Sequence, residues 1–169
     1  MSWPRILCLV LACSLSGCGY TPLYGTNAAG VQNSVALSRV SIAPIGPDMV
    51  GYDVRTALLD QMNPDGEPSQ PLHRLEVTLA PALAGLLVQP DAAITRYNYV
   101  LQGTYKLSDL TTGKIVTQGD VTGTSAYNVV TSEYATVVAR RDAERRAAHT
   151  VSDAISLRVA LYLKGKSSS

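Results

Sequence analysis

Hydrophobic residues recur along the chain with two spacings, and each spacing predicts a different kind of element. Alternating apolar and polar residues are typical of strands with one buried face, whereas apolar residues three and four positions apart are typical of helices. In chain order, the patterns predict a strand over 35–45, a helix over 49–62, strands over 72–89, 93–107 and 114–127, and a helix over 132–163.

The residues at the ends of these segments agree with the pattern. Asp48 is expected to cap the first helix, and the run Asn63-Pro64-Asp65-Gly66 is expected to end it. Pro44 should end the first strand or lie at a sheet edge, while Pro81 and Gly85 predict a bend or bulge in the second strand. Short connections between the last three strands predict an antiparallel meander.

Two apolar rows define the expected core. On the third strand, one face carries Tyr97, Tyr99, Leu101, Tyr105 and Leu107, which we interpret as core rather than as a ligand platform. On the long helix, one stripe carries Ala135, Val138, Ala139, Ala143, Ala147, Val151, Ala154, Ile155, Val159 and Tyr162. Both rows would pack against each other if the helices cover one face of the sheet.

The order β-α-β-β-β-α therefore predicts an α+β fold, a two-layer sandwich with a mostly antiparallel four-stranded sheet and two helices on one face. A single domain is expected over 35–163, after a tether over 18–34 and before a flexible tail over 164–169. The pattern leaves open what covers the second sheet face. The apolar stretch 80–88 fits either a core strand or a surface that contacts a partner or acyl chains.

Composition excludes several classes of protein. The chain has 169 residues, of which 46% are hydrophobic and 16% charged, with 14 Lys and Arg against 13 Asp and Glu. Nucleic-acid binders normally carry a basic excess, so this balance argues against one. No stretch reaches the roughly 18 apolar residues of a transmembrane helix, and the apolar content is too high for a disordered chain.

The N-terminus predicts a lipoprotein signal peptide over residues 1–17. Arg5 precedes the apolar run 6–13, which is the right length for a signal sequence and too short for a membrane span. Leu15-Ser16-Gly17-Cys18 matches the bacterial lipobox, in which small residues admit a peptidase to the bond before the cysteine. Cys18 would then carry diacylglycerol on its sulfur and a further acyl chain, such as palmitate, on its amine. An ordinary signal peptide with an incidental cysteine is the alternative.

This interpretation changes the cysteine count. Cys8 and Cys13 leave with the signal peptide, so Cys18 is the one cysteine that remains and no disulfide is expected. Several acyl chains on one residue are enough for stable anchoring. Gly19 stands where an aspartate favours retention in the inner membrane, so the outer membrane, on its periplasmic face, is the expected location.

Catalytic and metal-binding patterns are nearly absent. His73 and His149 lie on different predicted elements without other ligands at metal-binding spacing, so no metal site is expected. The chain has no G-x-S-x-G, phosphate-binding loop or H-E-x-x-H motif. We therefore predict no enzyme and no cofactor beyond the covalent lipid on Cys18.

Two groups of charged residues are candidate contacts. The run 140–146 on the long helix contains four arginines and two acids, and is interpreted either as an internally paired, solvated face or as a contact for an anion or partner. Arg96 and Lys106 share strand parity, opposite to the tyrosine row. Their face is either plain solvent-facing surface or a surface that receives phosphate groups.

The sequence also resembles a known family. The octet Cys18-Gly19-Tyr20-Thr21-Pro22-Leu23-Tyr24-Gly25 is similar to the start of LptE-type lipopolysaccharide-assembly lipoproteins of the alphaproteobacterial kind. Further similar fragments follow in the same order, namely Thr95-Arg96-Tyr97, Tyr105-Lys106-Leu107-Ser108-Asp109, Thr112-Gly113, Ser125-Ala126-Tyr127-Asn128-Val129-Val130, Ser132-Glu133-Tyr134-Ala135 and Arg141-Asp142-Ala143. The resemblance covers nearly all of the chain after Cys18.

The resemblance implies a plug-and-barrel complex with the outer-membrane β-barrel LptD. The lipoprotein would sit in the barrel lumen, help the barrel to fold and assist delivery of lipopolysaccharide to the outer leaflet. Basic side chains are implicated in lipopolysaccharide binding by such proteins, and Arg96 and Lys106 are the candidates in this chain. The alternatives are an auxiliary lipoprotein of an ABC-type lipid or solute transport system, and a purely structural envelope lipoprotein.

Overall fold

A computed structural model describes residues 36–86 and 96–167 of the chain. Its elements are strand β1 (Val40–Ile42), helix α3 (Met49–Met62), strands β2 (His73–Leu86), β3 (Arg96–Asp109) and β4 (Ile115–Asn128), and helix α4 (Glu133–Ser167). The predicted signal peptide, the lipobox with Cys18 and the tether lie outside the described residues.

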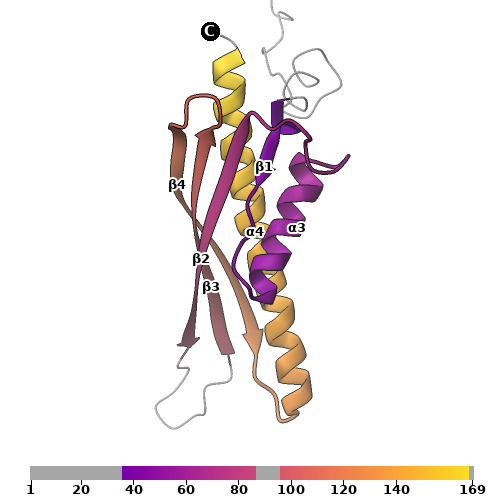
Figure 1. Cartoon of the computed structure of the whole chain (residues 1–169). Coiled ribbons are helices and arrows are strands. Elements are labelled where there is room, and N and C mark those ends of the chain that lie inside the picture. Colours follow the sequence, from indigo (N-terminus) through magenta and orange to yellow (C-terminus); the bar gives the residue numbers. More distant parts are fainter. Residues whose placement is uncertain (1–35, 87–95, 168–169) are drawn as a thin grey trace, which may run out of the picture.

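The four strands form one sheet in the order β1-β2-β3-β4, with both helices on the same face (Figure 1). β2, β3 and β4 are an antiparallel meander, whereas β1 runs parallel to β2. The predicted α+β fold with the order β-α-β-β-β-α is confirmed, and the sheet is mixed because the crossover through α3 returns the chain parallel to β1.

The first strand is much shorter than predicted. β1 covers three residues, and residues 36–37 before it are helical. The last hydrogen bond along β1 runs from the Ala43 N–H to the Leu75 carbonyl (2.9 Å), directly before Pro44. The side-chain amide of Asn63, at the end of α3, donates to the carbonyls of Val40 (3.2 Å) and Ser38 (3.4 Å), so the chain before β1 pairs with the helix end instead of extending the strand.

The predicted bulge in the second strand is wrong. β2 pairs with β3 residue for residue from His73 to Leu86, without a shift at Pro81 or Gly85. Leu75 accepts its bond from β1, so alternate residues along β2, including Pro81, direct their backbone groups away from β3. The N–H that Pro81 lacks would point to the β1 side, so no hydrogen bond between β2 and β3 is lost.

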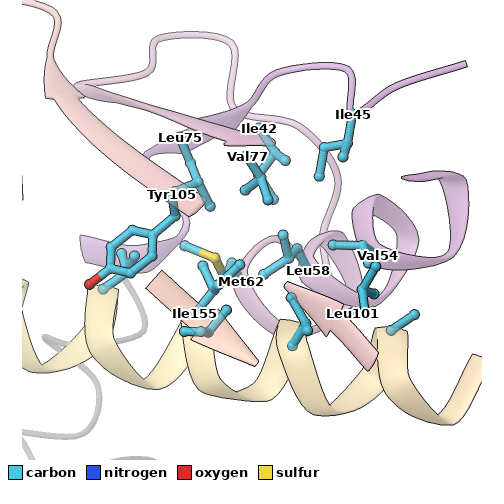
Figure 2. Close-up of a cluster of buried hydrophobic side chains, with 14 of the residues drawn as sticks. Ile42, Ile45, Val54, Leu58, Met62, Leu75, Val77, Leu101, Tyr105 and Ile155 are labelled. Carbon is cyan, nitrogen blue, oxygen red and sulfur yellow. The ribbon is translucent and has the colours of Figure 1, made fainter. Parts of the chain in front are cut away.

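Helix α3 has the predicted bounds, and Asp48 caps it by accepting a hydrogen bond from the Gly51 N–H (2.9 Å). Its buried side chains Val54, Leu58 and Met62 face β1 and α4. Figure 2 shows these residues meeting Leu75 and Leu101 from the sheet and Ile155 from α4. This cluster is the centre of the hydrophobic core.

Helix α4 approaches the sheet at two glycines. A Cβ built on Gly123 of β4 would lie 2.5 Å from the Ala147 carbonyl oxygen, and one on Gly103 of β3 would lie 2.9 Å from Val151. The helix residues at this contact are small, since Ala143 and Ala147 are fully buried. Most of the predicted apolar stripe is confirmed, but Val138, near the start of α4, is 48% exposed.

Helix α4 also extends four residues past its predicted end, into the segment expected to be a flexible tail. Lys164 and Lys166 lie in its last turn, where cations interact favourably with the helix dipole. Lys166 in addition pairs with Asp109 at the end of β3 (3.6 Å). These interactions favour helix where composition alone suggests fraying.

The two helices differ greatly in length, and this difference shapes the molecule. α3 has 14 residues and α4 has 35, which corresponds to roughly 21 and 52 Å of helix. α3 starts above the lower ends of the strands and runs upward, so the lowest part of the helix-side face in Figure 1 is covered by α4 alone. We call this part the lower end of the molecule.

The close contact at Gly123 predicts a large effect of one methyl group. Gly123→Ala should lower the free energy of unfolding by roughly 1–3 kcal/mol, because the helix backbone must move to admit the new atom. Urea unfolding followed by circular dichroism measures this change. Gly165→Ala in α4 is the matched control, since a Cβ there meets nothing within 4 Å. Equal stability of both variants would contradict the close packing.

Candidate functional surfaces

The face of the sheet opposite the helices is uncovered by any described residue. Its centre is formed by exposed alanines and threonines and by Gln102, and carries no charged side chain from Ala80 to Ala84 on β2 or across the paired positions of β3 and β4. Charges gather at its upper part, where Arg74 and Glu76 pair (3.3 Å) and Thr104 donates to Asp120 (2.6 Å). The described part of this second sheet face is thus mostly polar.

Arg96 and Lys106 both project from this face, as their parity predicts, but the structure does not bring them together. Arg96 begins β3 at the lower end, whereas Lys106 lies opposite Glu76 in the upper part. Ten residues of strand separate them, which is about 33 Å. One phosphate group therefore cannot contact both, and they are two separate candidate contacts.

The charge run on α4 is internally paired, as one of the two interpretations predicts. Glu144 accepts from Arg140 (3.0 Å) and Arg141 (3.4 Å), and Arg141 also pairs with Asp53 of α3 (2.8 Å). Arg146 pairs with Asp142 and reaches β4, where it donates to the Ser125 hydroxyl and the Ala126 carbonyl (both 3.0 Å). This run therefore ties α4 to α3 and to the sheet.

A second surface is a groove on the helix side, at the lower end. It is an open cavity of about 520 Å³ between the start of α3, the lower half of β2 and α4. We call it the lower groove; it is lined by Asp48, Met49, Val50, Pro81, Ala82, Leu83, Tyr99, Arg140, Arg141 and Glu144. Met49 is 67% exposed and Leu83 47% exposed, although Leu83 belongs to the inward row of its strand. Burial raises the pKa of Tyr99 at its floor, and the Glu144 carboxylate raises it further.

The upper end of the molecule holds a cluster of titratable groups. His73 is only 8% exposed, and neither ring nitrogen has a hydrogen-bond partner among the described residues. Burial lowers the pKa of His73 below its ordinary 6.5, while Asp109, its cross-strand neighbour, acts in the opposite direction. Backbone N–H groups of Thr112 (3.1 Å) and Thr111 (2.8 Å) donate to Asp109 and lower its pKa.

Among residues 36–86 and 96–167, no group of three or more His, Cys, Asp or Glu side chains could hold a metal ion. No helix in these ranges is long and apolar enough to cross a membrane. His149, expected to flank the stripe on α4, is exposed there.

Sequence reasoning missed the lower groove. The available signal was the apolar stretch from Ala80 onward, whose two interpretations were a core strand and a contact surface; the residues to Gly85 are exposed. A second signal was the difference between the predicted lengths of the two helices, because the shorter helix cannot cover the whole apolar face.

The fold recurs in solved structures of bacterial lipoproteins. A candidate lipoprotein from Caulobacter crescentus superposes with a TM-score of 0.65 at 22% identity, over 79% of this chain and 96% of that one. Rare lipoprotein B from Shewanella oneidensis gives 0.55 at 12% identity, over 72% and 92%. A minor lipoprotein from Acinetobacter baumannii gives 0.55 at 16% identity, over 74% and 94%.

These similarities define a class of fold, a small two-layer α+β domain that recurs in lipoproteins. No family model and no curated protein matches the chain. The comparison therefore assigns the fold alone.

The buried His73 predicts a pH dependence of stability. The folded chain holds His73 neutral, whereas the unfolded chain protonates it below about pH 6.5, so the unfolded state binds more protons as the pH falls. The free energy of unfolding should therefore decrease as the pH falls through and below 6.5. His73→Leu should remove this decrease in urea titrations.

The exposed His149 provides the control for this experiment. His149→Gln should keep the pH dependence of the natural chain, because its ring lies on the solvent side of α4. The same slope in His73→Leu as in the natural chain would show that another group causes it. The pKa of Asp109 is lowered from its ordinary 3.8, so this carboxylate changes charge in a more acidic range than His73.

Proposed function

We propose that the chain is an outer-membrane lipoprotein of the lipopolysaccharide transport and assembly complex, a plug and folding partner of the LptD β-barrel that assists delivery of lipopolysaccharide to the outer leaflet. One observation carries the proposal: a lipobox ending at Cys18, and the octet from Cys18 to Gly25, precede a fold that recurs in three solved lipoproteins. The acyl chains on Cys18 would hold the domain at the periplasmic face of the membrane.

The uncovered sheet face supports a position inside a barrel. Large outer-membrane barrels have polar interiors, and a plug must meet them without a large apolar surface. The central part of this face offers threonines, Gln102 and alanines, which can approach a polar wall closely without leaving a buried charge unpaired. The anchor would also raise the effective concentration of the domain near the barrel.

Arg96 and Lys106 are proposed as separate contacts for the phosphate groups of lipopolysaccharide. Both are exposed on the same face, and no ion pair of either is observed among the described residues. Each would make a charge-assisted contact with a phosphate oxygen. Because they lie far apart along β3, they would contact two different phosphate groups, or the same lipid at two stages of its transport.

The first test is purification of the partner. A C-terminally tagged chain, solubilised from outer membranes in detergent, should bring down one large β-barrel protein in stoichiometric amount, identified by mass spectrometry. An ABC transporter in its place would favour the auxiliary-lipoprotein alternative. Absence of both would contradict the proposal.

The anchor provides the control for this test. Cys18→Ala should leave the signal peptide uncleaved and the domain unacylated, while Cys8→Ala, inside the same signal peptide, should be processed and acylated as in the natural chain. Mass spectrometry of the intact chain distinguishes these states. Normal lipidation of Cys18→Ala would contradict the proposed anchor.

Charge reversal tests the proposed lipid contacts. Arg96→Glu and Lys106→Glu should each weaken lipopolysaccharide retention up to about fivefold, the strength of one exposed ion pair. Their effects should add, because the sites are far apart. Co-elution of lipopolysaccharide with the purified complex measures this, and Lys114→Glu, in the β3–β4 connection, is the control of equal charge. Equal losses in all three variants would contradict specific contacts.

A further inference from the structure

The β1 side of β2 is an open sheet edge over most of its length. β1 pairs with β2 only from Val40 opposite His73 to Ile42 opposite Leu75, and the Ala43 N–H makes the last bond to that edge. β2 then continues for eleven residues to Leu86, paired on the β3 side alone by the described parts of the chain. Unpaired strand edges are templates for a further strand.

The direction of the backbone groups identifies what this edge can bind. Because the Leu75 carbonyl points to β1, the N–H and C=O groups of the residues at even offsets from it point the same way. Val77 and Leu79 line a small pocket together with the segment from Ile45 to Asp48. Below it, the carbonyls of Pro81, Leu83 and Gly85 and the N–H groups of Leu83 and Gly85 have no backbone partner among the described residues.

The lower groove lies directly beside this open part of the edge. Pro81 and Leu83 line it from β2, and Met49 and Val50 line it from the start of α3. At the upper end, β1 fills the equivalent place, where Val40 and Ile42 are buried beneath α3. The lower end thus lacks the strand that completes the sandwich above it.

The charges of the groove favour an uncharged occupant. Its two arginines are already paired with Glu144 and Asp53, so no cation is left over for an anionic headgroup. A lipid chain would satisfy the apolar wall but would leave the backbone groups of Leu83 and Gly85 without partners, which is costly in a dry site. An extended polypeptide satisfies both.

We propose that the β2 edge from Pro81 to Gly85 is a β-augmentation site, which takes an extended strand of a partner protein whose alternate apolar side chains enter the lower groove. Main-chain hydrogen bonds would supply affinity and the groove would select the side chains. This inference is independent of the proposed function, since it requires a partner strand but neither a barrel nor lipopolysaccharide.

A peptide probe tests the site directly. We would titrate the full chain with a soluble peptide of alternating threonine and valine with lysines at both ends, and follow amide hydrogen exchange by NMR. The amides of Leu83 and Gly85 should exchange rapidly in the free chain and slow down when the peptide binds. The same peptide with N-methyl groups on every backbone amide, whose methyl groups block strand pairing along both edges, should give no protection.

Variants at Leu83 separate a strand from other occupants. Leu83→Pro removes one edge N–H and no bond to β3, and should weaken peptide binding at least about fivefold, the value of one net hydrogen bond. Leu83→Val keeps the N–H and an apolar side chain, and should bind as the natural chain does. The comparison of the two peptides on the natural chain stands even if the proline variant does not fold.

Three outcomes would overturn the proposal. The first is that the peptide leaves the Leu83 and Gly85 amides unprotected. The second is equal protection by the methylated peptide, which indicates apolar contact without strand pairing. The third is slow exchange of these amides in the free chain, which shows that the chain itself, or a second copy of it, already covers the edge; the apparent mass in solution distinguishes these two.

Discussion

The whole architecture depends on how closely α4 approaches the sheet. Gly123 and Gly103 provide the space on the sheet side, and Ala143 and Ala147 provide it on the helix side. This contact places the axis of α4 over β3 and β4, so that α3 must pack beside α4 and above the β1–β2 side of the sheet. A larger residue at the contact would push α4 away from the sheet. The side chains of Val54, Leu58 and Ile155 would then no longer pack closely against one another.

The same arrangement accounts for the contrast between the two ends of the molecule. At the upper end β1, α3 and the end of α4 converge on β2, and Lys166 ties α4 to Asp109. At the lower end β1 is absent and α3 has not yet begun, while Tyr97 of β3 and Tyr127 of β4 stack with ring centroids 5.7 Å apart. We therefore expect the upper end to be the more stable part of the domain and the lower end to provide its contact surface.

Local signals predicted the elements well wherever they were strong. Asp48 and the Asn63-Pro64 stop define α3 because caps and prolines act within one turn, and the buried tyrosines of β3 follow strict alternation. The length of β1 was mispredicted because it depends on Asn63, which bonds the Ser38 carbonyl from 25 residues away. Likewise, parity placed Arg96 and Lys106 on one face, but only the register shows how far apart they lie. The lower groove forms because α3 is much shorter than α4 and the strands beside it. The pattern of any one segment does not reveal such a difference between packed elements.

Both ends of the described fold lie at the upper end of the molecule, where residue 36 enters and α4 finishes (Figure 1). The proposed tether on the N-terminal side would therefore act as a pivot at one end of the domain, whose length is that of α4, roughly 50 Å. Rotation about such a pivot sweeps the lower end through a wide arc and leaves the upper end almost in place. On the proposed tether, the open edge of β2 would thus be the part of the domain that moves farthest.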